Sequence, residues 1–343
     1  MITVEDDGAS LFLDIVEASI REGRRVTVEE AECLISTRAM SFTLSAYEKL
    51  LGLTRDDMVS ILVNLGSERP VGTDPVKLRF EEGFRSCYSL DAVSRLRGEV
   101  EAALSMDFGV AERKALRYLP AGTVIGSTVF LTVDAFNPGM VRGGDVGRSI
   151  IHGLHGISMD HMAHEFHHAG VMDCLSRRPG IARVAVSADT PEEVAAQLVC
   201  NLVSEGLANH YCTPNMVRAG GHKNPEANER IRGYERNLSA LFEETWSLIG
   251  DCLDGGKPLE EYRERLMDIL IDRESILPKV HFIGEKIISV LEEDPEVGFK
   301  DIVELCNRPE NLVSLYAGPA ARLGLPRLPD EYALKLQQIM AEM

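Results

Sequence analysis

The sequence predicts an α+β fold that is mostly α-helical, with a short β-sheet and with helical N-terminal and C-terminal parts. Two observations lead to this prediction. Helix-capping residues followed by amphipathic runs recur through the first 115 residues, and helical patterns return after Pro258. One stretch, residues 128–136, has the β-branched and aromatic composition of a strand and ends at a turn-forming Asn-Pro-Gly sequence.

Residues 1–115 show only the patterns of core-forming helices. Thr27 with Glu30 is typical of a capping box, and Thr54 and Ser89 each precede an amphipathic run. No residues in this region have the types or spacing of a chemical site. We therefore expect an N-terminal helical region that carries no chemistry of its own.

The segment after the strand is dense in glycine from residue 139 to residue 156. It lacks the closing Gly-Lys-Ser/Thr of a phosphate-binding loop, so we interpret it as a mobile loop beside the site described below. Ser158 is expected to cap a helix that runs to about Arg177. The stretch that follows, up to Asp189, contains Pro and Gly and is expected to be a loop.

The rest of the chain is again predicted to be helical. Thr190 with Glu193 indicates the start of one helix, and a polar loop from Thr213 to Asn228 separates it from the next, which contains Tyr234. From about Pro258 onward, prolines mark the expected helix breaks, at Pro309, Pro319, Pro326 and Pro329.

Residues 164–168 read His-Glu-Phe-His-His and contain the motif H-E-x-x-H. Residues four apart lie on one face of an α-helix, about 6 Å apart along its axis, so His164 and His168 can bind one tetrahedral Zn²⁺. Glu165 then lies beside the metal, where it can take a proton from a water molecule. Six of the nine histidines fall between residues 152 and 168, which strengthens the prediction of a metal site.

A catalytic zinc site needs a third protein ligand, and Glu205 is the best candidate. It continues the apolar stripe of the helix that begins at Thr190. An unpaired carboxylate on a buried face is costly, whereas one that binds a metal is not. Gly206 follows directly and leaves room for the backbone of another element.

Other residues near the motif are alternatives for the third ligand. His210 lies on the same helix as Glu205, and His155 and His161 lie just before the motif. We interpret His161 as a polar residue at the start of the motif helix; a group that supports the metal ligands is the alternative. Three cysteines are expected to be buried and structural rather than zinc ligands, namely Cys174, Cys200 and Cys212.

This pattern resembles the gluzincins, zinc metallopeptidases with H-E-x-x-H on one helix and a glutamate ligand on a later one. Over roughly residues 120–320 the chain is also similar to uncharacterised families of zinc-dependent peptidases. The resemblance implies one Zn²⁺ per chain, held by His164, His168 and Glu205, with Glu165 as the general base. Gluzincins often have an aspartate four residues after the ligand glutamate that orients a zinc-bound histidine; here Asn209 takes that place.

The resemblance also implies a thermolysin-like core over residues 116–250, with residues 251–343 packing on the site. Gluzincins bind the substrate backbone along an edge strand that precedes the motif helix, and residues 128–136 are the expected counterpart; an ordinary core strand is the alternative. A Tyr or His after the third ligand often stabilises the oxyanion in that family. His281 is our candidate for this role, with a structural histidine as the alternative, and Tyr234 is a second candidate.

The predicted function is that of a zinc-dependent peptidase, in which Glu165 removes a proton from a metal-activated water. The alternative is a non-catalytic sensor or interaction protein that a metal stabilises, in which Glu165 would be dispensable. A di-iron carboxylate protein is a remote alternative, because it needs a second E-x-x-H and the sequence has none.

Composition narrows the partners and the location. The chain of 343 residues has 36 Lys and Arg against 54 Asp and Glu, a net charge of −18, which disfavours nucleic acid and anionic membranes. A peptide or protein substrate is therefore the expected partner, and no feature predicts the oligomeric state. We expect a cytoplasmic protein, because there is no secretory signal or long apolar run and the seven cysteines form no C-x-x-C pair.

Overall fold

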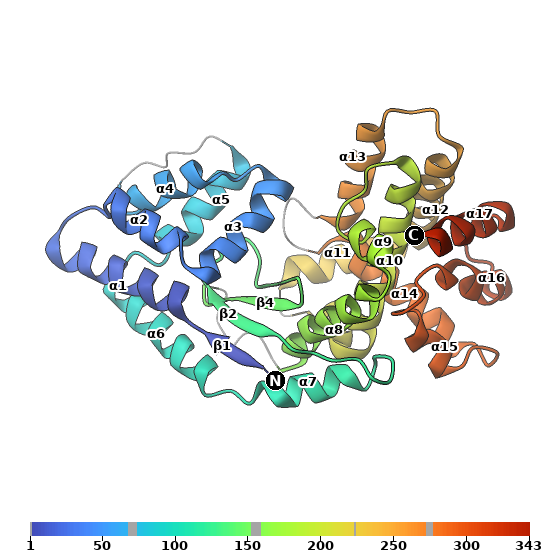
Figure 1. Ribbon diagram of the computed structural model, residues 1–343, viewed down its shortest axis with the longest axis horizontal. Coiled ribbons are helices and arrows are strands. Elements are labelled where there is room, and N and C mark those ends of the chain that lie inside the picture. Colours follow the sequence, from blue (N-terminus) through green and yellow to red (C-terminus); the bar gives the residue numbers. More distant parts are fainter. Residues whose placement is uncertain (1, 68–73, 152–158, 223, 272–276) are drawn as a thin grey trace. The chain divides into compact units, whose positions relative to one another are not determined.

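The computed structural model describes residues 2–67, 74–151, 159–222, 224–271 and 277–343. The chain forms two compact units, one of residues 1–111 with 125–165 and the other of residues 112–124 with 166–343. The described residues are mostly helical, and they include a small mixed sheet of four strands (Figure 1). The α+β class predicted from the sequence is therefore confirmed.

The sheet belongs to the first unit and has the strand order β1-β2-β4-β3. Strand β2 pairs in parallel with both β1 and β4, whereas β3 pairs antiparallel with β4. The four strands are β1 (Thr3–Glu5), β2 (Thr128–Thr132), β3 (Gly139–Arg142) and β4 (Asp145–Ser149). The expected strand at residues 128–136 is thus present as β2, but the expectation that it forms an edge is wrong. Its backbone groups are paired on both sides, so it cannot accept a substrate strand.

A tight hairpin replaces part of the loop that was expected at residues 139–156. Gly143 and Gly144 connect β3 to β4, and both have positive φ, 58° and 88°. Two-residue hairpin turns favour glycine because they require such angles. The remainder of the expected loop, including Ser158, lies outside the described residues.

Helices of the first unit pack on this sheet and on one another. Helices α1 and α3 contact β2, and α6 packs on α1. The capping pattern of Thr27 with Glu30 is confirmed at the start of α2, and Thr54 and Ser89 cap α4 and α6. One short strand, β1, lies in the region for which only helices were expected. The helices are α1 (Asp7–Glu22), α2 (Val28–Ile35), α3 (Arg38–Leu51), α4 (Arg55–Val63), α5 (Pro75–Arg85) and α6 (Leu90–Leu104).

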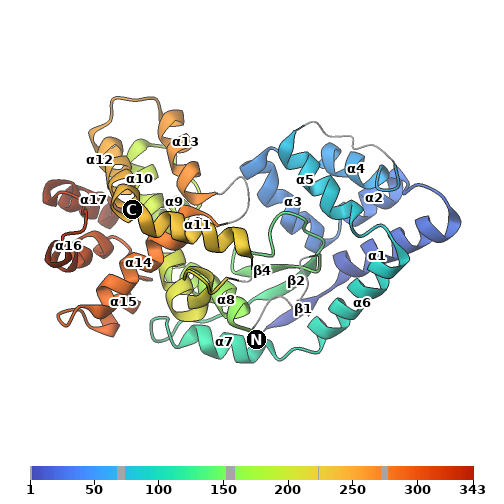
Figure 2. The same ribbon diagram turned by 180° about the vertical axis from the view of Figure 1, so that it is seen from behind.

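Two helices continue from one unit into the other, α7 (Phe108–Leu116) and α8 (Met159–Ser176). The second unit is built around α10 (Pro191–Leu207), which packs against α9, α12, α13, α14 and α17 (Figure 2). The others are α9 (Pro179–Val184), α11 (Pro225–Arg236), α12 (Leu238–Asp254), α13 (Leu259–Leu270), α14 (Lys279–Glu293), α15 (Phe299–Glu304), α16 (Asn311–Leu323) and α17 (Asp330–Glu342).

Two expectations for this unit are wrong. The stretch from Arg177 to Asp189, expected to be a loop, contains helix α9. Pro179 stands in the first turn of this helix, where a proline is compatible with helical structure. Pro319 does not end a helix but lies inside α16, where it and the neighbouring Tyr316 and Ala320 are buried. Burial of this face keeps the helix continuous despite the missing backbone N–H.

Cysteine burial agrees with the sequence analysis. Cys174, Cys200 and Cys212 are all buried, as expected, and burial raises the pKa of the Cys200 thiol to about 12. In the described part of the chain, no helix is long and apolar enough to cross a membrane.

Candidate metal centre

Helix α8 carries the H-E-x-x-H motif and presents its two predicted ligands on one face. His164 and Glu165 are almost fully buried, 4% and 5% exposed, and His168 is partly buried one turn later. The third histidine of the pentapeptide, His167, points elsewhere: its Nε2 lies 3.1 Å from the carbonyl oxygen of Tyr118. The helix therefore separates His164 and His168 from the adjacent His167, as the four-residue spacing predicted.

Glu205, on helix α10, meets the two motif histidines. Its Oε1 lies 3.4 Å from Nε2 of His168. One ligand atom each from His164, His168 and Glu205 can be chosen so that all three lie within 4.8 Å of one another. The structure thus brings together the three residues that the sequence analysis selected as metal ligands.

The crossing of α10 and α14 has no room for side chains. A Cβ atom on Gly206 would lie 2.6 Å from the carbonyl oxygen of Gly284, and one on Gly284 would lie 2.7 Å from the carbonyl oxygen of Leu202. The expectation that Gly206 admits another backbone is confirmed. Because Gly206 follows Glu205 and His281 lies one turn before Gly284, this contact brings His281 to Glu205.

His281 and Glu205 are in direct contact. Nδ1 of His281 lies 2.9 Å from Oε2 of Glu205 and 2.9 Å from the side-chain nitrogen of Asn209, so it donates to the carboxylate when it carries a proton. The side-chain amide nitrogen of Asn209 donates to the carbonyl oxygen of Glu205 at 2.8 Å and lies 3.4 Å from its Oε2. One carboxylate is therefore held from two directions, by α14 and by the π-helical turn Ala208–Cys212 that continues α10.

The residue that contacts a motif histidine is Ser204 rather than Asn209. Nδ1 of His168 lies 2.7 Å from the Ser204 hydroxyl. Among the described residues, Asn209 contacts Glu205, His281 and Thr213, because the α10–α14 crossing places His281 next to it. The resemblance-based expectation that Asn209 orients a ligand histidine is therefore not met. An N–H bond from Nδ1 to Ser204 would leave the Nε2 lone pair of His168 for a metal.

The side chain of Glu165 is enclosed by residues of the first unit. Its Oε1 lies 3.7 Å from Nε2 of His161, one turn earlier on α8. Gly139, the first residue of β3, packs so closely that a Cβ atom there would lie 2.8 Å from the same oxygen. The strand thus begins directly against the predicted general base.

Other sequence candidates have different partners. His210 lies between two carboxylates, with Nδ1 3.3 Å from Glu285 and Nε2 2.7 Å from Glu292. Burial disfavours its charge, but the hydrogen bonds to both carboxylates outweigh this and raise the pKa of His210. Tyr234 donates its hydroxyl proton to the carbonyl oxygen of Leu277 at 2.9 Å. His210 is therefore not placed as a metal ligand, and His155 lies outside the described residues.

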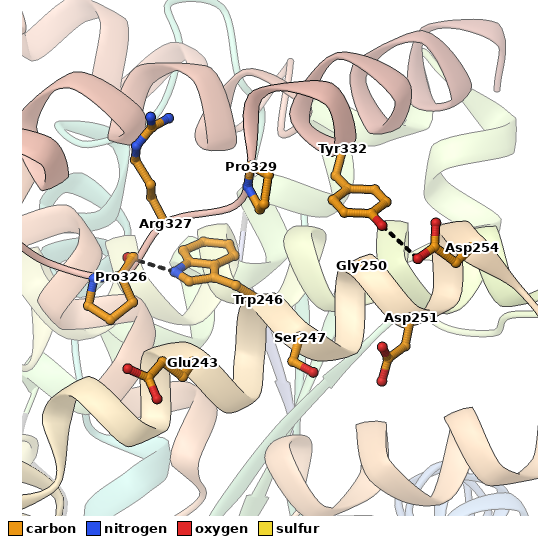
Figure 3. A pocket seen from close by; sticks show the side chains of 10 residues that line it. All are labelled: Glu243, Trp246, Ser247, Gly250, Asp251, Asp254, Pro326, Arg327, Pro329 and Tyr332. Carbon is orange, nitrogen blue, oxygen red and sulfur yellow. Dashed lines mark hydrogen bonds between the residues drawn. The ribbon is translucent and has the colours of Figure 1, made fainter.

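A cavity of about 320 Å³ lies elsewhere in the second unit, beside α12 and the segment that leads into α17 (Figure 3). Trp246 donates its indole N–H to the carbonyl oxygen of Pro326, and the Tyr332 hydroxyl bonds to Asp254. The residues that line it include none of the candidate site residues from the sequence analysis.

The donor set fits zinc. Two imidazoles and one carboxylate are the ligands of many catalytic zinc sites, which bind the metal at about 2.0–2.2 Å. Such bonds in tetrahedral geometry place ligand atoms about 3.4 Å apart, and the His168–Glu205 distance is 3.4 Å. The three ligand atoms lie within 4.8 Å of one another, so any wider pair would have to close toward this spacing to hold the ion.

Comparison with known families agrees with this geometry. A family model described as "Putative zinc dependent peptidase (DUF5700)" matches residues 108–322, more than half of the chain. The chain belongs to this family. The range that matches the zinc-dependent peptidase family contains the motif helix α8, Glu205 and His281. No curated protein and no solved structure matches the chain.

Two residues of this site were missed by the sequence analysis. Ser204 lies next to Glu205, so its contact with His168 follows once Glu205 is accepted as a site residue. Arg148 has no local signal except that it follows the Gly143-Gly144 pair, which has Val141 and Val146 two residues to either side, the pattern of a hairpin. Recognising that hairpin would have placed Arg148 opposite Gly139, near the motif helix.

Proposed function

We propose that this member of the family is a zinc-dependent peptidase of the gluzincin type. His164, His168 and Glu205 would hold one zinc ion, and Glu165 would act as the general base. The observation that carries the proposal is the meeting of Glu205, from a separate helix, with the two histidines of the motif. When bound, zinc would polarise both an attacking water and the carbonyl of the scissile bond.

Glu165 would accept the proton of the attacking water and deliver it to the leaving amine. This step is typically worth about 10²–10⁴-fold in rate. Two observations support it: the carboxylate is almost completely buried, and it adjoins a ligand in sequence. A buried carboxylate against Gly139 has few orientations open to it, which favours a well-aligned proton transfer.

His281 would stabilise the oxyanion that forms on the scissile carbonyl. Its Nδ1 donates to Glu205, and this bond fixes the orientation of the ring. When the ring is doubly protonated, both of its nitrogens donate, and Nε2 on the other side of the ring would then be the donor to the oxyanion. This role of His281 is supported by its contact with a predicted metal ligand.

Strand β3 would bind the substrate backbone, in place of the interior strand β2. It is the terminal strand of the sheet order, and it begins at Gly139, against Glu165. A peptide that adds a strand to this edge would therefore pass close to the general base. This arrangement would correspond to the thermolysin-like core that the resemblance implies.

The test combines metal analysis with peptide hydrolysis on the full-length protein. Zinc is measured by elemental analysis, and cleavage of a peptide library is followed by mass spectrometry. Wild-type protein should bind one equivalent of zinc and cleave peptides. Glu165→Gln should keep the zinc but lose at least about 100-fold in rate, since it removes only the base. Glu205→Ala should lose the zinc.

Glu235→Gln is the matched control, because Glu235 is an exposed glutamate on α11. It should bind zinc and cleave peptides like the wild type. A wild-type protein that binds zinc but cleaves no peptide would favour the non-catalytic, metal-stabilised alternative. Hydrolysis by Glu165→Gln at the wild-type rate would contradict the role of Glu165.

A further inference from the structure

Arg148, on strand β4, is a fully buried arginine with an incomplete set of partners. Its side chain is 0% exposed. Nη1 donates to the carbonyl oxygen of Pro138 at 3.0 Å. Nε and Nη2 have no hydrogen-bond acceptor among the described residues. Burying a cation without a paired anion costs roughly several kcal/mol of folding stability. Stabilising the fold therefore does not explain why an arginine is buried here.

The charge that acts on Arg148 is that of Glu165. Burial lowers the pKa of Arg148 to about 9, and the Glu165 carboxylate acts in the opposite direction. The guanidinium therefore stays cationic at neutral pH. A buried cation near a predicted general base is the kind of costly feature that proteins keep at functional sites.

The sheet register explains how this arginine reaches the motif helix. Arg148 is paired directly with Gly139 across the β3–β4 hairpin. Side chains of such a pair lie on the same face of the sheet, and Gly139 has none. A Cβ atom on Gly139 would lie 2.8 Å from Oε1 of Glu165 and 3.3 Å from Cε1 of His161. The glycine thus leaves space that Arg148, His161 and Glu165 share.

The contacts also fix the protonation of His161. Nη1 of Arg148 lies 3.4 Å from Nδ1 of His161. A guanidinium only donates hydrogen bonds, so Nδ1 must accept, and the proton of the neutral ring is on Nε2. Nε2 is the atom that lies 3.7 Å from Oε1 of Glu165. Arg148 therefore sets which nitrogen of His161 carries the proton, and this N–H faces Glu165 at a distance longer than a direct hydrogen bond.

We propose that Arg148 and His161 are a positioning pair for Glu165. Arg148 holds His161 in the Nε2–H tautomer, and His161 directs this N–H toward Oε1 of the general base. The pair gives His161 a role other than that of a polar residue at the start of a helix. This inference rests on the proposed function of Glu165. Loss of groups that orient a metal-site residue typically costs about 10- to 100-fold in activity.

The tautomer can be measured without any activity assay. Long-range ¹H–¹⁵N correlation spectra of protein labelled with ¹⁵N-histidine distinguish Nε2–H from Nδ1–H rings, and the spectrum of His161→Gln identifies the signal of His161. In wild-type protein His161 should be in the Nε2–H form. Arg148→Met should lose this preference, whereas Arg95→Met, which changes an exposed arginine on α6, should keep it. A wild-type His161 in the Nδ1–H form would overturn the proposal.

Kinetics and stability separate positioning from a structural role. Arg148→Met should lower kcat by about 10- to 100-fold with zinc content and KM close to those of the wild type. Its urea midpoint should be unchanged or higher, because a costly buried charge is removed. Arg148→Lys, which keeps the charge, should recover part of the kcat that Arg148→Met loses. His161→Gln, which keeps an N–H donor, should have a higher kcat than His161→Leu. An unchanged kcat in Arg148→Met contradicts the pair.

The outcomes distinguish this inference from the proposed function. If the wild-type protein cleaves no peptide, the peptidase proposal fails, while the tautomer measurement still decides whether Arg148 controls His161. If Glu165→Gln abolishes cleavage but neither Arg148→Met nor His161→Leu slows it, the peptidase proposal stands and the positioning pair is refuted.

Discussion

Gly206 of α10 and Gly284 of α14 meet backbone to backbone, and their contact holds His281 against Glu205. A Cβ atom on either glycine would lie 2.6–2.7 Å from a carbonyl oxygen of the other helix. Nδ1 of His281 lies 2.9 Å from Oε2 of Glu205 on the same side of this crossing. The helix contact that forms the core of the second unit therefore also fixes one predicted ligand and the candidate oxyanion donor.

Gly284→Ala should separate the two helices and destabilise the protein. The new methyl group would meet backbone atoms, which cannot move as a flexible side chain can, so we expect a loss of about 1–3 kcal/mol in the free energy of unfolding by urea. Gly98→Ala is the control: this glycine is exposed within α6 and has open space around it, so the change should stabilise by about 0.5–1 kcal/mol. Equal stability changes in the two variants would mean that the crossing tolerates a side chain.

Ser204→Ala should weaken zinc binding, because His168 would lose the hydroxyl 2.7 Å from its Nδ1. Loss of such a partner typically lowers metal affinity by about 10- to 100-fold. Competition with a chromophoric chelator measures this change, and Ser204→Thr should restore most of the affinity because it keeps the hydroxyl. Wild-type affinity in Ser204→Ala would show that Ser204 does not orient His168.

Removal of zinc should lower the melting temperature of the wild-type protein. An ion that binds only the folded state stabilises it by RT ln(1 + [L]/Kd), about 4 kcal/mol at a thousandfold excess over Kd. The two ligand helices, α8 and α10, are distant in sequence, so the unfolded chain has no comparable site. Melting with and without EDTA tests this, and Glu205→Ala should show little difference between the two conditions.

Local patterns in the sequence were enough for much of the fold and for selecting the three side chains that cluster as candidate metal ligands. Caps such as Thr27 and Thr54 depend on hydrogen bonds within a few residues, which a sequence shows directly. The motif histidines share one helix, so their spacing determines their geometry. Glu205 was identified because a carboxylate on an apolar stripe is costly without a partner.

The parts that sequence analysis got wrong depend on partners far away in the chain. Whether β2 is an edge or interior strand depends on its pairing with β1, more than a hundred residues earlier. Asn209 contacts His281 rather than a motif histidine because α14 crosses α10 at two glycines. The position of Arg148 next to Glu165 requires the register of the β3–β4 hairpin, which places Gly139 opposite it. Such relationships are set by tertiary packing, which no local pattern of these residues shows.

Asp134 should make the protein less stable as pH rises, which is the opposite of the usual effect of an aspartate. Burial raises the pKa of Asp134 to about 6, from an ordinary value of 3.8, although Tyr47 and the backbone N–H groups of Phe136 and Asn137 donate to it. Because the folded state binds the proton more tightly, this group makes the protein less stable as pH rises from about 4 to about 6.

Asp134→Asn removes this titration but keeps an oxygen that can accept the two backbone N–H bonds. Relative to the wild type, the variant should therefore gain stability between pH 4 and pH 7. A shift of about 2 pKa units corresponds to on the order of 3 kcal/mol. Urea unfolding of both proteins at the two pH values measures the change, and the comparison cancels the titration of the other carboxylates. A stability difference that is the same at pH 4 and pH 7 would mean that Asp134 titrates alike in the folded and unfolded states.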